Sequence, residues 1–114
     1  MITNDVLKPM VIEVGDKTYT LEFNRNSVAS AERAGLDLNR ITTEPMNMIP
    51  LLFFAAFKMH QPFMTREETD KILFDELNGL TAEEVRRLGE LYAAPTNALM
   101  NSGEGERKNA RISL

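Results

Sequence analysis

Cysteine and tryptophan are absent from this chain of 114 residues, and histidine occurs once. Without cysteine there is no disulfide, no thiolate metal ligand and no thiol nucleophile. A single histidine leaves no second imidazole to complete a zinc site of the common spacings. The sequence also lacks a glycine-rich loop between a strand and a helix, where phosphates are often bound. These absences argue against an enzyme, and we expect a non-enzymatic protein with no cofactor and no metal.

Positive charge and long apolar runs are also scarce. The 13 basic residues are outnumbered by 17 acidic ones, and a net charge of −4 argues against nucleic acid or anionic lipid as the main partner. The longest uninterrupted apolar run, residues 51–57, is far shorter than the ~18 residues that a membrane-spanning helix needs. No basic segment followed by an apolar one opens the sequence. We therefore expect one cytoplasmic domain that binds neither membranes nor nucleic acid.

Apolar side chains concentrate between Met46 and Met64, a segment that holds four of the six phenylalanines and four of the seven methionines. Methionine is flexible and is enriched on surfaces that accommodate varied apolar partners. Helical spacing predicts a core stripe, which consists of Ile49, Leu52, Phe53 and Ala56. Off this stripe or beyond the helix lie Met46, Met48, Phe54, Phe57, Phe63 and Met64, for which we weigh partner binding or self-association equally with burial. The candidate partner-binding residues are Phe54, Phe57, Met59, Phe63 and Met64.

Prolines divide this apolar segment. Pro45 suits the start of a helix, whereas Pro50 lacks the N–H that a helix interior requires. We predict a firm helix from Ile49 or Pro50 to about residues 58–60, ended before Pro62.

The N-terminal part has the pattern of a β-hairpin. Residues 10–14 and 18–23 carry β-branched and aromatic side chains in alternation around Gly15-Asp16-Lys17. Tyr19, Leu21 and Phe23 share one face. Because an isolated hairpin is marginal in water, this face must pack against the helices that follow.

Capping residues indicate three further helices. Asn26 or Ser27 can cap a helix over residues 28–34 that Gly35 ends, and residues 36–43 form either a loop or a short extended piece. Thr65 and Thr81, each with glutamate three residues later, are typical of capping boxes for helices over residues 66–78 and 82–94. Pro95 kinks or ends the last helix, and residues 96–101 add at most one turn.

The predicted fold is α+β and mostly helical, with the hairpin packed on a small bundle of about four helices. One domain covers residues 1–101, with the hairpin at 10–23 and the helices over 26–101. Residues 102–114 have no periodicity and mixed charge, which predicts a flexible, disordered tail.

Two other sites have ordinary structural explanations. His60 sits at a helix end with no second metal ligand nearby, and the acidic pairs after Thr65 and Thr81 favour the helix N-termini.

Residues 74–88 also have the outline of a helix-turn-helix. Its second helix would place Glu83 and Glu84 against DNA phosphates, with Arg86 and Arg87 behind them. A small DNA-binding regulator or adaptor is therefore the alternative function.

The order of these parts resembles the tail assembly chaperones of long-tailed (siphovirus-type) bacteriophages and prophages. The resemblance covers residues 10–100: the hairpin, the phrase EFNRNSVASAERAG (22–35), the PLLFFAAF helix (50–57), the capped acidic helix and the charged tail. It implies a protein of the bacterial host cytoplasm that binds the tape-measure protein, keeps it soluble and passes it to tail-tube subunits. It also implies absence from the mature virion.

The same resemblance gives the tail a possible coding role. Many such proteins are made in two lengths by a −1 ribosomal frameshift near the end of the shorter reading frame. Arg107-Lys108-Asn109 can be encoded by a slippery A-AAA-AAY sequence. An AAG codon at Lys108, or no overlapping −1 frame, would remove this support.

Overall fold

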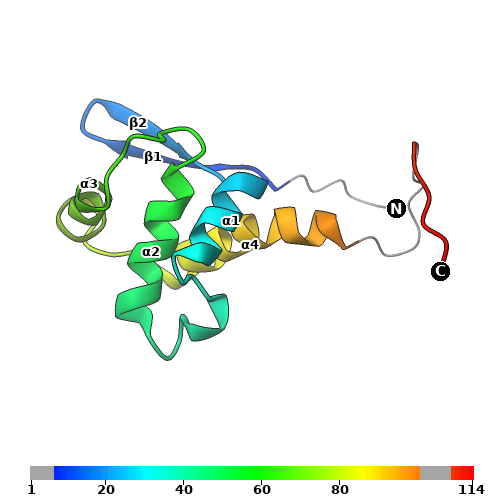
Figure 1. Cartoon of the computed structure of the whole chain (residues 1–114). Helices are drawn as coiled ribbons and strands as arrows, with labels where there is room; N and C mark the ends of the chain where they lie inside the picture. Colours follow the sequence, from blue (N-terminus) through cyan, green and yellow to red (C-terminus); the bar gives the residue numbers. More distant parts are fainter. Residues whose placement is uncertain (1–6, 101–108) are drawn as a thin grey trace, which may run out of the picture.

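The computed structural model describes residues 7–100 and 109–114. Within these ranges the chain forms an antiparallel hairpin and four α-helices, with a 3-10 turn and a π-helical segment between them. Their order is β1 (Met10–Val14), β2 (Lys17–Leu21), α1 (Arg25–Arg33), η1 (Leu38–Arg40), α2 (Pro45–Phe57), α3 (Arg66–Lys71), η2 (Ile72–Glu76) and α4 (Ala82–Leu99). The predicted α+β, mostly helical fold is confirmed, with the hairpin on one side of the helices (Figure 1).

The predicted hairpin forms, but its turn has two residues, Gly15 and Asp16, because Lys17 already belongs to β2. Val14 pairs with Lys17, and Gly15 takes a φ of 64°, which suits the first position of a tight hairpin turn. Alternation places Tyr19 and Leu21 on the inward face, with Leu21 fully buried. The second strand ends at Leu21, two residues earlier than predicted, and Phe23 still reaches the core.

Helix α1 begins earlier than the sequence suggested, because Asn24 is its cap. The Asn24 side chain accepts the Ser27 N–H at 2.8 Å, and the Ser27 hydroxyl accepts the Asn24 N–H at 2.9 Å. The prediction of Asn26 or Ser27 as the cap was therefore wrong. Gly35 ends the helix in the left-handed region, with a φ of 98°, as predicted. The ambiguous stretch that follows is a turn with η1, and Leu36 anchors it in the core.

Helix α2 starts at Pro45 and continues through Pro50, which corrects the predicted start at residue 49 or 50. A proline inside a helix costs roughly 3 kcal/mol, because the carbonyl four residues earlier loses its donor. Burying one large apolar side chain gains about 1.5–3 kcal/mol. Several such residues on α2 are buried, so their burial outweighs the loss at Pro50; they are Met48, Leu52, Phe53 and Phe57.

Both predicted capping boxes are present, and the helices they start differ beyond the first turns. Thr65 and Thr81 each accept the N–H of the glutamate three residues on, at 3.1 Å. The predicted helix 66–78 changes at Ile72 into η2, where the Leu77 N–H reaches back five residues to the Ile72 carbonyl at 2.8 Å. Helix α4 continues through Pro95 to Leu99, so Pro95 does not end it.

The turn after η2 uses two left-handed residues in succession. Asn78 has a φ of 56° and Gly79 a φ of 93°. The Gly79 N–H donates to the Leu73 carbonyl at 2.8 Å, a six-residue bond that closes the helix end. Gly79 ends this helical stretch as predicted, and the chain turns from there into α4.

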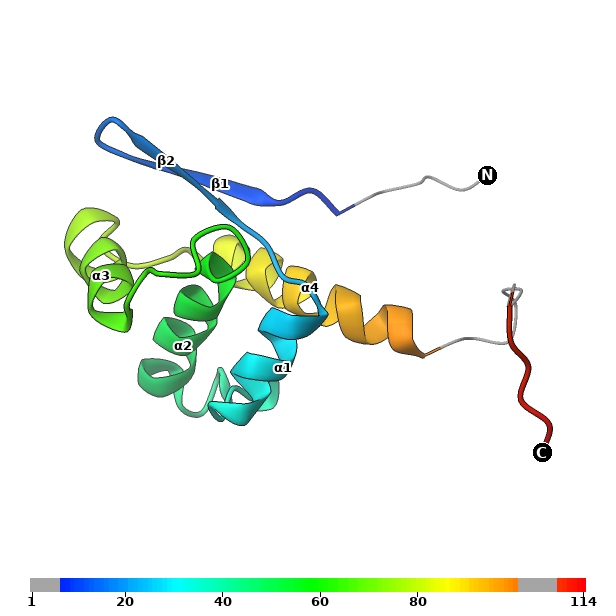
Figure 2. The same cartoon turned by 45° about the horizontal axis from the view of Figure 1, so that its top comes forward.

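The core lies around α2, which packs against α1, α3, α4 and β2. Figure 2 shows α1, α2 and α3 below the hairpin, with α4 running behind them. Edge-to-face ring pairs connect the elements: Phe53 and Phe57 have centroids 5.0 Å apart, Phe57 and Tyr19 5.5 Å, and Phe23 and Tyr92 5.1 Å. The Tyr19–Phe57 pair joins the hairpin to α2, and the Phe23–Tyr92 pair joins the segment after the hairpin to α4.

The predicted tail falls partly outside the described residues, which exclude 101–108 and with them Arg107 and Lys108 of the proposed slippery sequence. Residues 109–114 are exposed and form neither helix nor strand. The disorder proposed for residues 102–114 stays a prediction.

Candidate partner-binding surface

The five candidate partner-binding residues lie in three different environments. Phe57 is 0 % exposed, so its prediction as a surface residue was wrong. Phe54 is half-buried beneath the Lys58 ammonium, which lies 5.1 Å from the ring centroid, and Met64 is half-buried against the core. Met59 is 38 % exposed and Phe63 is 93 % exposed. Phe63 is thus the most accessible of the five.

Phe57 is buried because several elements cover α2, so more of its faces are in the core than the single predicted core stripe. Phe57 lies four residues after Phe53 and continues its row toward the hairpin, where Tyr19 packs on its ring. The predicted core residues Leu52, Phe53 and Ala56 are each 0 % exposed, which confirms them. Ile49 is only half-buried, at the outer end of the stripe.

The two methionines at the start of α2 also differ in their exposure to solvent. Met48 is 4 % exposed and belongs to the core, whereas Met46 is 75 % exposed. Exposed apolar side chains therefore stand at both ends of α2, with Met46 at its first turn and Met59 and Phe63 beyond its last. A helix of this length separates its ends by about 20 Å.

A small apolar pocket beside Met46 was not anticipated from the sequence. Phe74, 47 % exposed, stands on η2 across from the first turns of α2. Together these elements line an open surface pocket of about 170 Å³ that we call the apolar pocket. Its lining is almost entirely apolar: Pro45, Met46, Ile49, Pro50, Leu73, Phe74, Gly79 and Leu80. The position of Phe74 between a core leucine and two acidic residues is the one sequence feature that could have indicated it.

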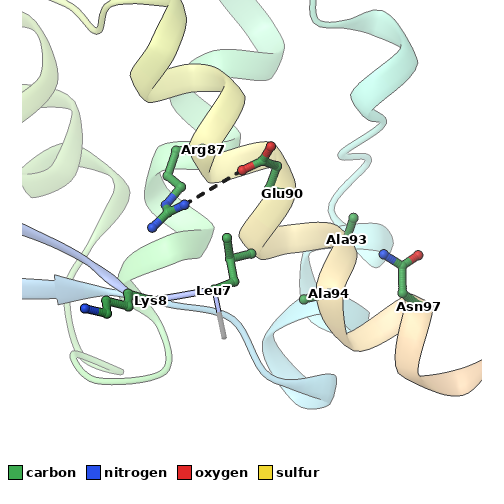
Figure 3. A pocket seen from close by; sticks show the side chains of 7 residues that line it. All are labelled: Leu7, Lys8, Arg87, Glu90, Ala93, Ala94 and Asn97. Carbon is green, nitrogen blue, oxygen red and sulfur yellow. Dashed lines mark ion pairs between the residues drawn. The ribbon is translucent and has the colours of Figure 1, made fainter. Parts of the chain in front are cut away.

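A second and larger cavity, about 670 Å³, lies between the N-terminal segment and α4 (Figure 3). Arg87 and Glu90 point toward one another there, with 4.0 Å between Nη1 and Oε1, and Leu7 lies beside their ion pair. Lys8 extends away from this pair, and small alanines of α4 form the wall. The charged groups that line this cavity are those of Lys8, Arg87 and Glu90.

Comparison with known proteins places the whole fold in one family. The family model described as "Domain of unknown function (DUF5055)" matches residues 6–114. The chain belongs to this family. No curated protein matches the chain, and no solved structure matches it. The DUF5055 match spans the hairpin, all the described helices and the apolar side chains at both ends of α2.

In this DUF5055 chain, the two arginines of the predicted helix-turn-helix, Arg86 and Arg87, are paired with carboxylates. Arg86 forms ion pairs with Glu83 and Glu90, and these contacts raise its pKa, while the pKa of the Glu83 carboxyl is lowered by the hydrogen bond from Arg86. Arg87 shares Glu90. The start of α4 therefore presents acidic groups and neutralised arginines, a poor match for phosphates.

His60, which follows α2, has a structural partner. His60 Nε2 lies 2.8 Å from a Glu22 carboxylate oxygen, which ties the loop after α2 to the end of the hairpin. Over residues 7–100 and 109–114, no group of three or more potential ligands could hold a metal ion. In the same ranges, no helix has the length and apolarity needed to cross a membrane.

Proposed function

We propose that this DUF5055 protein is a non-enzymatic tail assembly chaperone of a long-tailed phage or prophage. It binds apolar segments of the tape-measure protein in the bacterial cytoplasm, keeps that protein soluble, and releases it as tail-tube subunits assemble. The protein does not remain in the mature virion. The observation that carries this proposal is the exposure of large apolar side chains near both ends of α2, with Met46 and Phe74 beside its start and Phe63 beyond its end.

The energetics of these side chains suit reversible binding. Covering one phenylalanine or methionine gains about 1.5–3 kcal/mol. Two or three such contacts, set against the entropy lost on association, give weak complexes that dissociate readily. A chaperone needs this behaviour, because its client must leave when assembly begins.

The resemblance of residues 10–100 to tail assembly chaperones names the client. The order of elements on which that resemblance rests, a hairpin followed by helices, is the order in the structure. The acidic surface is also consistent with a protein client, since Glu83 and Glu90 occupy the arginines at the start of α4. A DNA-binding regulator is the weaker alternative for this reason.

Co-expression with the tape-measure protein encoded beside it tests the proposal. We expect the tape-measure protein to appear in the soluble fraction and to co-purify with the chain. The Phe63→Ser variant should reduce co-purification, whereas Thr42→Ser, an exposed conservative change in the turn before α2, should not. A tape-measure protein that is equally insoluble with and without the chain would contradict the proposal.

A further inference from the structure

An open pocket of about 260 Å³ lies where the end of α1 and the turn after it meet α4. Two of its lining residues are acidic, Glu32 on α1 and Asp37 in the turn, and none of its lining residues is basic. Leu36 and Leu38 form an apolar wall, and Tyr92 lines the pocket from α4. We call this site the acidic pocket.

The turn after α1 brings the two acidic residues to one place. The Leu36 N–H donates to the Ala31 carbonyl at 3.0 Å. The Gly35 N–H donates to the backbone carbonyl of Glu32, also at 3.0 Å, and this pair of bonds closes the helix and reverses the chain. The Asp37 carboxylate accepts a backbone N–H of η1 at 3.0 Å, which fixes its side chain. Both acidic residues therefore lie at the C-terminal end of α1, where the helix dipole also favours a cation.

Neither of these carboxylates forms an ion pair within the part of the chain that the structure describes. Glu32 also lines an adjoining pocket in which Arg25 is the basic lining residue, and the two side chains are not paired. By contrast, arginines hold the carboxylates of Glu44, Glu83 and Glu90. The acidic pocket thus presents negative charge that no described side chain neutralises.

Tyr92 is an independent indication of a ligand at this site. Its side chain is 7 % exposed, and its ring packs on Phe23 with 5.1 Å between the centroids. Its hydroxyl has no hydrogen-bond partner among the described residues, where no fully buried side-chain oxygen lacks one, so the hydroxyl must reach the pocket. Burial raises the pKa of the Tyr92 phenol, and the charges of Glu32 and Asp37 raise it further. A polar group buried to this extent normally has a partner, which an occupant of the pocket would supply.

The lining fits the end of a long basic side chain. Leu36 is buried and Leu38 is half-buried, and such apolar surface covers the methylene stem of lysine or arginine well. A lysine ammonium donates hydrogen bonds and accepts none, and the pocket offers the oxygens of two carboxylates and one phenol. The pocket is also larger than an apolar cavity of roughly 150 Å³ that holds benzene in another protein, so the stem has room.

We propose that the acidic pocket binds the side chain of a lysine or arginine carried by a protein partner. A protein segment fits better than a small free cation, because Glu32 also borders the adjoining pocket, where Leu99 is 68 % exposed and can cover an apolar neighbour of the basic residue. The assignment of that segment to the tape-measure client rests on the proposed function.

A synthetic peptide tests the pocket directly. The probe carries one lysine between leucines and a fluorescent label, and its anisotropy is titrated with the full chain. A second peptide has acetyl-lysine at the same position, which retains the stem and removes the charge. We expect the lysine peptide to bind more tightly and its affinity to fall as the salt concentration rises. Equal binding of the two peptides would overturn the proposal.

Variants of nearly unchanged shape test the residues. Replacing Glu32 by Gln and Asp37 by Asn together should weaken the lysine peptide about tenfold, and Asn retains an acceptor for the N–H of η1. Tyr92→Phe keeps the ring and should weaken the peptide several-fold. The matched control is Glu13→Gln, the same loss of charge at an exposed position of β1 outside the pocket lining, which should leave the affinity unchanged. Equal weakening by Glu13→Gln would show a general charge effect and overturn the proposal.

The outcomes separate this inference from the proposed function. If the double variant binds the lysine peptide like the wild type while the wild type solubilises the tape-measure protein, the pocket assignment fails and the proposed function stands. If the peptide needs both carboxylates but the tape-measure protein stays insoluble, the proposed function fails and the pocket remains a site for a basic side chain. If Arg111→Gln alone shifts the NMR signals of the Tyr92 ring without peptide, the C-terminal segment of the chain is the occupant and the inference fails.

Discussion

Phe57 and Phe63 differ in their surroundings although they are near neighbours in the sequence. Phe57 is 0 % exposed and contacts the rings of Phe53 and Tyr19, whereas Phe63 is 93 % exposed in the loop before α3. Composition cannot distinguish two such residues, since both are apolar and both flank the end of one helix. The difference arises from the hairpin, which returns over α2 and covers only the first of them.

The two phenylalanines should therefore differ in their effect on stability. We expect Phe57→Ala to lower the free energy of unfolding by about 3–5 kcal/mol, because it leaves a cavity beside two rings. Phe63→Ser should change it by no more than about 0.5 kcal/mol, as an exposed substitution. Urea unfolding followed by circular dichroism measures both. A large loss for Phe63→Ser would show that this ring is covered in solution, for example by self-association.

At the scale of the secondary-structure element, the capping boxes are the most local interactions in the chain. Thr65 and Glu68 exchange hydrogen bonds within one turn, and no distant residue is needed to form them. Replacing Thr65 by Ala should lower the free energy of unfolding by about 0.5–2 kcal/mol. Thr42→Ala, in an exposed turn, is the control and should have little effect. Thermal or urea unfolding of the wild type, Thr65→Ala and Thr42→Ala measures these losses, and equal losses in the two variants would contradict the capping role of Thr65.

The same box predicts a pH dependence. The backbone N–H of Thr65, helped by its hydroxyl, holds the pKa of the Glu68 carboxyl below its ordinary value of 4.5. The unfolded chain therefore binds a proton at Glu68 more readily than the folded chain does. The contribution of the Glu68 carboxylate to folding stability is fully present at a pH above its ordinary pKa, and it is lost as the pH falls through the lowered pKa of the folded chain. The stability difference between wild type and Glu68→Gln should shrink over that range. A difference independent of pH between 7 and the acid range would contradict this.

Local interactions of this kind explain which parts of the fold were predictable. The hairpin turn at Gly15 and the boxes at Thr65 and Thr81 depend on neighbouring residues, and the structure contains all three. The start of α2 depends on burial by distant elements, which outweighs a missing backbone donor. Helix α4 continues through Pro95 although residues 96–99 are exposed, so burial does not account for its last turn. The apolar pocket requires η2 to lie against α2, and no local pattern specifies that contact.

At the scale of the whole molecule, α2 connects the parts, since it packs on α1, α3, α4 and β2. Leu52, in the middle of this helix, is 0 % exposed. Replacing Leu52 by Ala should cost about 2–5 kcal/mol and should weaken the hairpin and α4 together. Native-state hydrogen exchange measures this residue by residue. Faster exchange confined to α2 would show instead that the surrounding elements are stable without it.

The left-handed pair at the end of η2 has a chemical consequence. In an Asn-Gly sequence the glycine nitrogen can attack the asparagine side-chain carbonyl, which closes a succinimide ring and releases the side-chain nitrogen as ammonia. Water then opens the ring to aspartate or isoaspartate. Here the Gly79 N–H is held by the Leu73 carbonyl at 2.8 Å, so its nitrogen is restrained in the folded chain. We expect Asn78 to deamidate slowly in native protein and faster in urea, as peptide mapping of aged samples would reveal. The age of a preparation would then be recorded as new negative charge beside the apolar pocket.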